Sequence, residues 1–275
     1  MNRPVIDTLV KNLYRHLDDD LFNWRESKES LQELVKTMEC NRMHALHLID
    51  SNFYDNKSIR VLDYGCGTGI YVLLLLLKGY PNVHGVDINQ KFNKKILEKL
   101  DFNNASFNII GDKLPFESNY FDVINSTTVL EHVENIEAYY QEAARVLKPG
   151  GVCFFHFPHR IQPYDTHSKT WFIHYFPKPI RRILWNIFSA QKNGESLNNY
   201  LYYRTVSTHK RVAKKYFSIT ENRTEERLKK IYFVNYKGNL KIRKMVFKLI
   251  NLRFFSGFFL KIFSKLASVD LYLKK

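Results

Sequence analysis

The chain has 275 residues, of which 45% are hydrophobic and 25% are charged. This composition is typical of a globular protein with a sizeable core, and it excludes collagen-like, disordered and disulfide-scaffold proteins. The three cysteines, Cys40, Cys66 and Cys153, contain no CxxC pair. The sequence therefore predicts neither a disulfide framework nor a four-cysteine zinc site, and it favours a reducing, cytoplasmic compartment.

The formal net charge of +15 is unevenly distributed. Residues 1–177 contain 19 Lys and Arg against 22 Asp and Glu, whereas residues 178–275 contain 23 against 5. The basic C-terminal part is therefore expected to meet an anionic partner. The longest apolar run, residues 70–77, is far shorter than the roughly twenty residues that cross a bilayer. We therefore expect no membrane span, and no cleaved signal peptide at the charged N-terminus.

Apolar spacing predicts helices over residues 4–17 and 28–50. From residue 58 onward, short apolar strands alternate with helices. Strands are expected at 59–64, 83–87, 106–110, 121–126 and 151–157, and helices at 69–79, 90–101 and 134–147. Such alternation predicts an α/β fold, in which helices cover both faces of a mostly parallel sheet. Ligands of such a sheet bind at the carboxyl ends of its strands.

Beyond residue 157 the pattern is less regular. Helices are expected at 178–190, 205–216 and 239–266, and short strands at 216–220 and 268–273. We expect three parts: an N-terminal helical cap at 1–54, a nucleotide-binding Rossmann-like core at 55–160, and a basic, helical, acceptor-binding region at 161–275 that completes the sheet.

A glycine-rich turn follows the first expected strand, with Gly65, Gly67 and Gly69 at alternate positions. Glycine allows a tight turn and the close approach of a ligand. Asp87 ends the next strand, where a carboxylate can accept both hydroxyls of a ribose. These residues alone are compatible with either NAD or S-adenosylmethionine as the cofactor. The dinucleotide-binding pattern, however, would require glycine at position 70, where this chain has Ile70.

Four segments in combination favour one of the two cofactors: VLDYGCGTG at 61–69, GDKLPF at 111–116, VLEHV at 129–133 and LKPGG at 147–151. Over about residues 55–160 the chain resembles the class I S-adenosylmethionine-dependent methyltransferases. The resemblance implies a seven-stranded sheet whose last strand is antiparallel, and S-adenosylmethionine as cofactor. The implied cofactor-binding residues are Asp63, Gly65, Cys66, Gly67 and Gly69 at the methionine end, Asp87 at the ribose, Asp112, Lys113 and Leu114 at the adenine, and Asn125 and Ser126 beneath the methionine. Ile88, next to Asp87, is also expected to bind the cofactor.

A cluster of histidines follows the fifth strand. A histidine there could remove the proton of a hydroxyl acceptor, and His159, His167 and His174 are the catalytic candidates. His156 lies within the strand and is expected to support the core, whereas His132 is either structural or functional. Arg160 is expected to bind a phosphate or carboxylate of the acceptor. A metal site is the rival interpretation of the cluster, but its spacing fits no compact zinc site, so none is expected.

The segment after strand five is loosely similar to methyltransferases of surface-polysaccharide assembly. We therefore expect O-methylation of a sugar, glycan or other small acceptor, which could be lipid-linked. The alternatives are an RNA methyltransferase, suggested by the pI of about 9.6 but lacking a recognisable RNA-binding motif, and a non-catalytic S-adenosylmethionine-binding protein. Residues 239–266 are rich in lysine and phenylalanine. They are expected either to contact an anionic membrane surface, which would place the protein on the inner face of the membrane, or to pack on their own domain. Nucleic acid is the least favoured partner of this segment.

Overall fold

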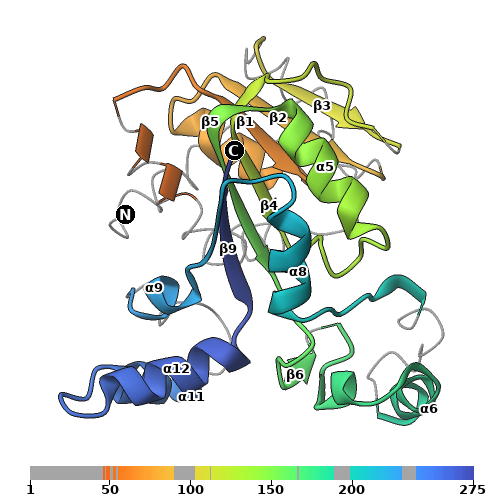
Figure 1. The fold of residues 1–275 in the computed structure, drawn as a ribbon, viewed down its shortest axis with the longest axis vertical. Coiled ribbons are helices and arrows are strands. Elements are labelled where there is room, and N and C mark those ends of the chain that lie inside the picture. The colour runs from red at the N-terminus through yellow and green to blue at the C-terminus, as the bar shows by residue number, and fades with distance from the viewer. Residues whose placement is uncertain are drawn as a thin grey trace, which may run out of the picture.

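The computed structural model (Figure 1) describes residues 46, 48–49, 52–53, 55–89, 103–111, 113–165, 167–188, 199–230 and 240–275. The expected helices at 4–17 and 90–101, and most of the one at 28–50, lie outside the described residues. Residues 46, 48 and 49 are helical, which agrees with the end of the helix expected over residues 28–50.

A seven-stranded sheet forms the centre of the fold, in the order β3-β2-β1-β4-β5-β9-β8. The strands are β1 (Arg60–Tyr64), β2 (Asn82–Asp87), β3 (Ser106–Ile109), β4 (Phe121–Thr127), β5 (Leu147–Phe157), β8 (Ile219–Asn222) and β9 (Val269–Lys274). Strands β1 to β5 pair in parallel, and β9 pairs antiparallel with both β5 and β8. The predicted α/β fold is confirmed, including the closing antiparallel strand.

Alternating side chains of the central strands face two helical layers. Val61 of β1 packs against α3 (Ile70–Leu77), while its neighbour Leu62 faces α5 (Ile136–Val146) and α8 (Val206–Ala213) on the opposite face. This is the pattern that continuous apolar strands produce when both faces are covered. In Figure 1, α5 and α8 lie side by side along one face of the sheet.

The segment after β5 forms a small separate layer. It contains β6 (Tyr164–Asp165), β7 (Thr170–Trp171), the short helix η2 (Ile173–Tyr175) and α6 (Lys178–Phe188). Trp185 of α6 is fully buried against Ile173, Leu201 and Tyr203. This satellite core positions the histidine-rich segment at the carboxyl edge of the sheet.

The basic C-terminal region forms a helical hairpin of α11 (Leu240–Ile250) and α12 (Ser256–Leu266). The helix expected over 239–266 is thus interrupted before Ser256. Val246, Ile250 and Leu260 form the interior of the hairpin with Leu228 of α9 (Thr224–Leu228). Among the described residues, no helix combines the length and apolar character that a membrane crossing requires.

Candidate functional site

The carboxyl ends of β1 and β2 are joined by the turn that follows β1. The backbone amides of Gly65 and Cys66 both donate to the carbonyl of Val86, at 2.9 and 2.8 Å. The Cys66 side chain is buried in the core beneath the turn. The turn is therefore fixed to the second strand by its own backbone.

Glycine is required at Gly65 for two separate reasons. Its φ of +85° lies in the left-handed region, and a Cβ there would overlap the side chain of Val129. Gly67, with φ of +54°, has open space where its Cβ would be. The turn is thus packed on one side and open at Gly67, where a ligand can approach the backbone.

Asp87 connects the open turn to the end of β2. Its carboxylate accepts from the amide of Gly67 at 2.8 Å and from that of Asn89 at 3.0 Å. Each carboxylate oxygen thus keeps acceptor capacity for a further donor. Ile88 beside it is 69% exposed, an apolar surface on which a flat ring could rest.

A buried polar pair lies between β1 and β4. Asp63 is fully buried and accepts from the side-chain amide of Asn125 at 2.8 Å. Asn125 Oδ1 is buried and has no hydrogen-bond partner among the described residues. Ser126 instead bonds to the hydroxyl of Tyr139 in the α5 layer, at 2.8 Å. The structure therefore brings Asp63 and Asn125 together and separates Ser126 from them.

The segment after β3 is held by an ion pair of α5 that the sequence analysis did not identify. Glu142 accepts from the backbone amide of Leu114, and Arg145 donates to the carbonyls of Leu114 and Phe116. The hydrogen bond from Arg145, 2.8 Å from Glu142, is the main reason that the pKa of Glu142 lies below its usual value. Lys113 is exposed, and Asp112 lies outside the described residues.

The three predicted catalytic histidines occupy different environments. His159 is buried and bonds to the carbonyl of Ala267 at 3.1 Å, and burial lowers its pKa. His174 is also buried, with its ring tilted by 50° against that of Tyr203, and burial lowers its pKa to about 4. His167 is partly exposed; burial lowers its pKa, but Glu131 more than offsets this and the net shift is upward. The three assignments stay predictions, as does that of Arg160, whose side chain is exposed.

His156, expected to support the core, belongs to a polar pair at the end of β5. Its Nδ1 lies 2.8 Å from Oδ1 of Asp270 on the neighbouring strand β9. Arg227 of α9 donates to the other oxygen of this carboxylate and to the carbonyl of Ser268. The β5–β9 register, which pairs these two strand positions directly, produces the contact; the sequence separation of 114 residues concealed it.

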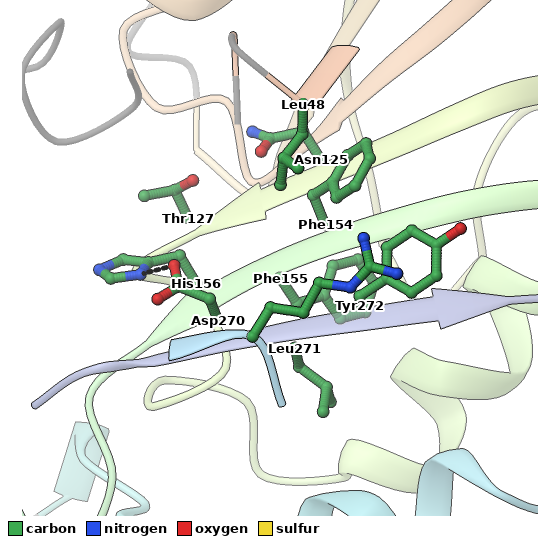
Figure 2. A pocket seen from close by; sticks show the side chains of 10 residues that line it. Leu48, Asn125, Thr127, Phe154, Phe155, His156, Asp270, Leu271 and Tyr272 are labelled. Carbon is green, nitrogen blue, oxygen red and sulfur yellow. Dashed lines mark hydrogen bonds and ion pairs between the residues drawn. The ribbon is translucent and has the colours of Figure 1, made fainter. Parts of the chain in front are cut away.

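This pair lines a small pocket that opens to solvent (Figure 2). Apolar and aromatic side chains surround its polar groups. The lining consists of Leu48, Asn125, Thr127, Phe154, Phe155, His156, Arg223, Asp270, Leu271 and Tyr272. Thr127 Oγ1, like Asn125 Oδ1, is buried and without a hydrogen-bond partner among the described residues. Unpartnered buried polar atoms are costly, so they indicate a place where a ligand completes the hydrogen bonding.

Comparisons with known proteins identify a family and a fold that this chain is similar to. Residues 62–155 match the family described as Methyltransferase domain. An uncharacterized methyltransferase of Schizosaccharomyces pombe is 36% identical over 117 residues, covering 36% of this chain and 40% of its own length. The demethylmenaquinone methyltransferase of Tropheryma whipplei (strain Twist) is 36% identical over 105 residues, covering 37% of this chain and 44% of its own.

A solved structure, that of the MccD protein, superimposes with a TM-score of 0.50 at 16% identity. It covers 84% of this chain and 96% of the MccD chain, and it supports the fold. This chain spans less than half the length of the curated relatives given above.

Substitution of Gly65 by alanine is expected to destabilise the fold by more than backbone strain alone. Gly79 supplies the matched control, because its φ is +84° but no atom lies within 4 Å of its hypothetical Cβ. We expect G79A to lower the free energy of unfolding by about 1–2 kcal/mol and G65A by about 2 kcal/mol more, in denaturant titrations. If G65A and G79A lowered the free energy of unfolding by the same amount, the overlap between a Cβ at position 65 and Val129 would be contradicted.

Proposed function

We propose that this chain, whose residues 62–155 match the family described as Methyltransferase domain, transfers the methyl group of S-adenosylmethionine to a hydroxyl group of a small acceptor. The expected acceptor is a sugar or glycan. The proposal rests chiefly on one observation: the open glycine turn with Asp87 and the pocket of His156 and Asp270 lie at the same carboxyl edge of the sheet.

The cofactor's adenosyl part would lie between the glycine turn and the end of β2. Asp87 would accept the ribose hydroxyls while its present bonds to Gly67 and Asn89 hold it in place. Ile88 would contact the adenine, and the segment at Leu114, braced by Glu142 and Arg145, would form the other wall. The buried pair of Asp63 and Asn125 would face the methionine portion.

His156 is the base that this geometry favours. Because a carboxylate oxygen only accepts, the hydrogen bond to Asp270 places a proton on Nδ1 and leaves the lone pair on Nε2. Nε2 would take the proton of the acceptor hydroxyl. Bound S-adenosylmethionine would supply an electrophilic methyl group: the hydroxyl oxygen would form the new bond to the methyl carbon, and the electrons of the broken carbon–sulfur bond would remain on sulfur, leaving S-adenosylhomocysteine.

The lining of the pocket supports a polyhydroxylated acceptor. Phe154 and Tyr272 offer aromatic rings, while Asn125, Thr127 and Arg223 offer hydrogen-bonding groups around the same hollow. A few convergent polar groups on an apolar wall are typical of small-molecule sites. Of the relatives, one is described as a demethylmenaquinone methyltransferase, so quinols form the comparison acceptors in the test below.

We further propose that the enzyme works at the inner face of an anionic membrane. The α11–α12 hairpin exposes Phe254, Phe255 and Phe258 by 61 to 86%, beside exposed Lys261 and Lys265. An apolar face next to lysines is typical of helices that lie in a membrane interface. The net charge of residues 178–275 complements anionic lipid.

The position of the hairpin suits a lipid-linked acceptor. Helix α12 leads into β9, whose first residue, Val269, pairs with Phe157 at the carboxyl end of β5. Helix α6, at the same end of the molecule in Figure 1, exposes Ile183, Ile187 and Phe188 by 56 to 67%. Both exposed apolar surfaces therefore flank the edge that holds the pocket.

The Asp87→Ala variant is expected to bind S-adenosylmethionine about 10- to 100-fold more weakly, because it lacks a charged hydrogen-bond acceptor. Isothermal titration calorimetry measures this affinity. The D55A variant removes an exposed aspartate outside the site and is expected to match the wild type. Unchanged affinity in D87A would contradict the cofactor site.

The His156→Asn variant is expected to lower kcat about 100-fold or more while its affinity for S-adenosylmethionine stays that of the wild type. The assay follows labelled methyl transfer to nucleotide sugars, glycans, quinols and RNA. D270N should lower kcat in the same assay, whereas D122N, which alters a carboxylate paired with Lys148 at the opposite edge, should not.

Transfer only to RNA or quinols would contradict the proposed acceptor class. Cofactor binding without transfer to any of these acceptors would favour a non-catalytic binding protein. Full activity of H156N would contradict the proposed role of His156 as the base, but it would not contradict the proposed methyl transfer.

The double variant Phe254→Ala, Phe258→Ala is expected to lose about tenfold or more of its partitioning onto anionic vesicles, because two exposed rings no longer insert. Vesicle co-sedimentation at low and high salt measures this, and binding should weaken as salt rises. The I109A variant, which removes an exposed apolar side chain of β3, should bind like the wild type. If the double variant partitioned onto the vesicles as strongly as the wild type, and salt did not weaken the binding, membrane docking would be contradicted.

A further inference from the structure

Three side chains of metal-ligating type meet at the carboxyl edge of the sheet, outside the pocket described above. Glu131 and His132 follow β4, and His167 comes from the segment after β5. One potential ligand atom from each lies within 4.8 Å of those of the other two. The His132 and His167 rings meet edge to face, with their centroids 4.9 Å apart. Chain segments 35 residues apart thus bring one carboxylate and two imidazoles together.

The carboxylate of Glu131 has an unusual environment. Its side chain is 0% exposed, and neither oxygen has a hydrogen-bond partner among the described residues. Nε2 of His167 lies 3.6 Å from Oε1, and this imidazole carries a positive charge only when it is protonated. Burying a carboxylate without hydrogen bonds is costly, so a further positive charge at this point would be strongly favoured.

The hydrogen bonding of His132 prepares it as a ligand. Its Nδ1 lies 3.0 Å from the backbone carbonyl of Tyr200, which can only accept, so Nδ1 carries the proton. The lone pair of the neutral ring is then on Nε2. A backbone carbonyl that fixes the tautomer of a histidine in this way is the usual partner of a metal-ligating imidazole.

We propose that Glu131, His132 and His167 bind a divalent first-row transition-metal ion. Two imidazole nitrogens and one carboxylate oxygen suit Zn²⁺, Fe²⁺ or Co²⁺, whereas Mg²⁺ prefers oxygen ligands. Three protein ligands leave at least one coordination position for another molecule. The expectation of a metal-free site, which was based on the spacing of the histidines after β5, did not include Glu131 and His132.

The position of the ion gives it a role in the proposed methyl transfer, on which this part of the inference rests. The amide of Thr128 bonds to the carbonyl of His156 at 2.7 Å, and Glu131 lies three residues farther along. Three residues span at most about 11 Å, so the cluster and His156 flank one small region. An acceptor oxygen bound to the ion would lose its proton more readily, and His156 would receive that proton.

Metal binding itself is the test, and it needs no acceptor. The full-length protein, stripped of metal with a chelator, is titrated with Co²⁺ and with Zn²⁺ by calorimetry. The visible absorption of Co²⁺ reports its ligands. We expect saturable binding of each ion at the site. The E131Q and H167Q variants should each weaken the affinity about 100-fold or more and change the Co²⁺ spectrum.

The H156N variant is the matched control, because it removes a nearby histidine that is bonded to Asp270 instead. It should bind Co²⁺ like the wild type. Circular dichroism and calorimetry with S-adenosylmethionine show that each variant is folded. Absence of saturable binding, tighter binding of Mg²⁺ than of Co²⁺, or unaltered affinity in folded E131Q and H167Q would overturn the proposal. Failure of the wild type to bind S-adenosylmethionine would instead overturn the proposed function and leave the metal site standing.

Discussion

Two backbone hydrogen bonds to one carbonyl determine the geometry of the functional edge. Because the amides of Gly65 and Cys66 both donate to Val86, the turn after β1 closes directly on the end of β2. That closure presents the Gly67 amide to Asp87 and keeps one side of the loop open. The left-handed backbone at Gly65 strongly favours a residue without a Cβ there. The proposed cofactor site thus depends on main-chain geometry more than on any single side chain.

The opposite half of the edge is built from side chains contributed by distant segments. His156 obtains its carboxylate partner from β9, and His167 meets Glu131 and His132 from the segment after β4. Two chemically different groups for handling an acceptor proton therefore flank one region, a hydrogen-bonded imidazole and a proposed metal ion. At the same end of the molecule, α6 and the α11–α12 hairpin expose apolar surfaces, which are the surfaces proposed to dock on a membrane.

The sequence predicted the core of the fold because its signals are local. Apolar runs such as residues 121–126, and glycines in a fixed pattern after residue 64, act through neighbours in the chain. The strands of the parallel core and the position of Asp87 at the end of β2 followed from them, whereas the closing antiparallel strand was implied by the family resemblance and the strand order was found only in the structure. The partners of His156, Glu131 and Leu114 did not, because they depend on strand register and on which helix packs over which loop. The residues that surround a histidine in the sequence of a strand do not indicate which aspartate of a neighbouring strand will lie beside it.

The pairing of β5 with β9 also sets an order of events during synthesis. Domains fold as translation proceeds from the N-terminus, and strands β1 to β5 leave the ribosome well before residue 270. A nascent chain can therefore assemble its nucleotide-binding turn early, yet its imidazole lacks Asp270 until β9 emerges and inserts between β5 and β8. The contact between His156 and Asp270 therefore forms only after the last strand has joined the sheet, so the proposed base would gain its carboxylate partner at the end of folding.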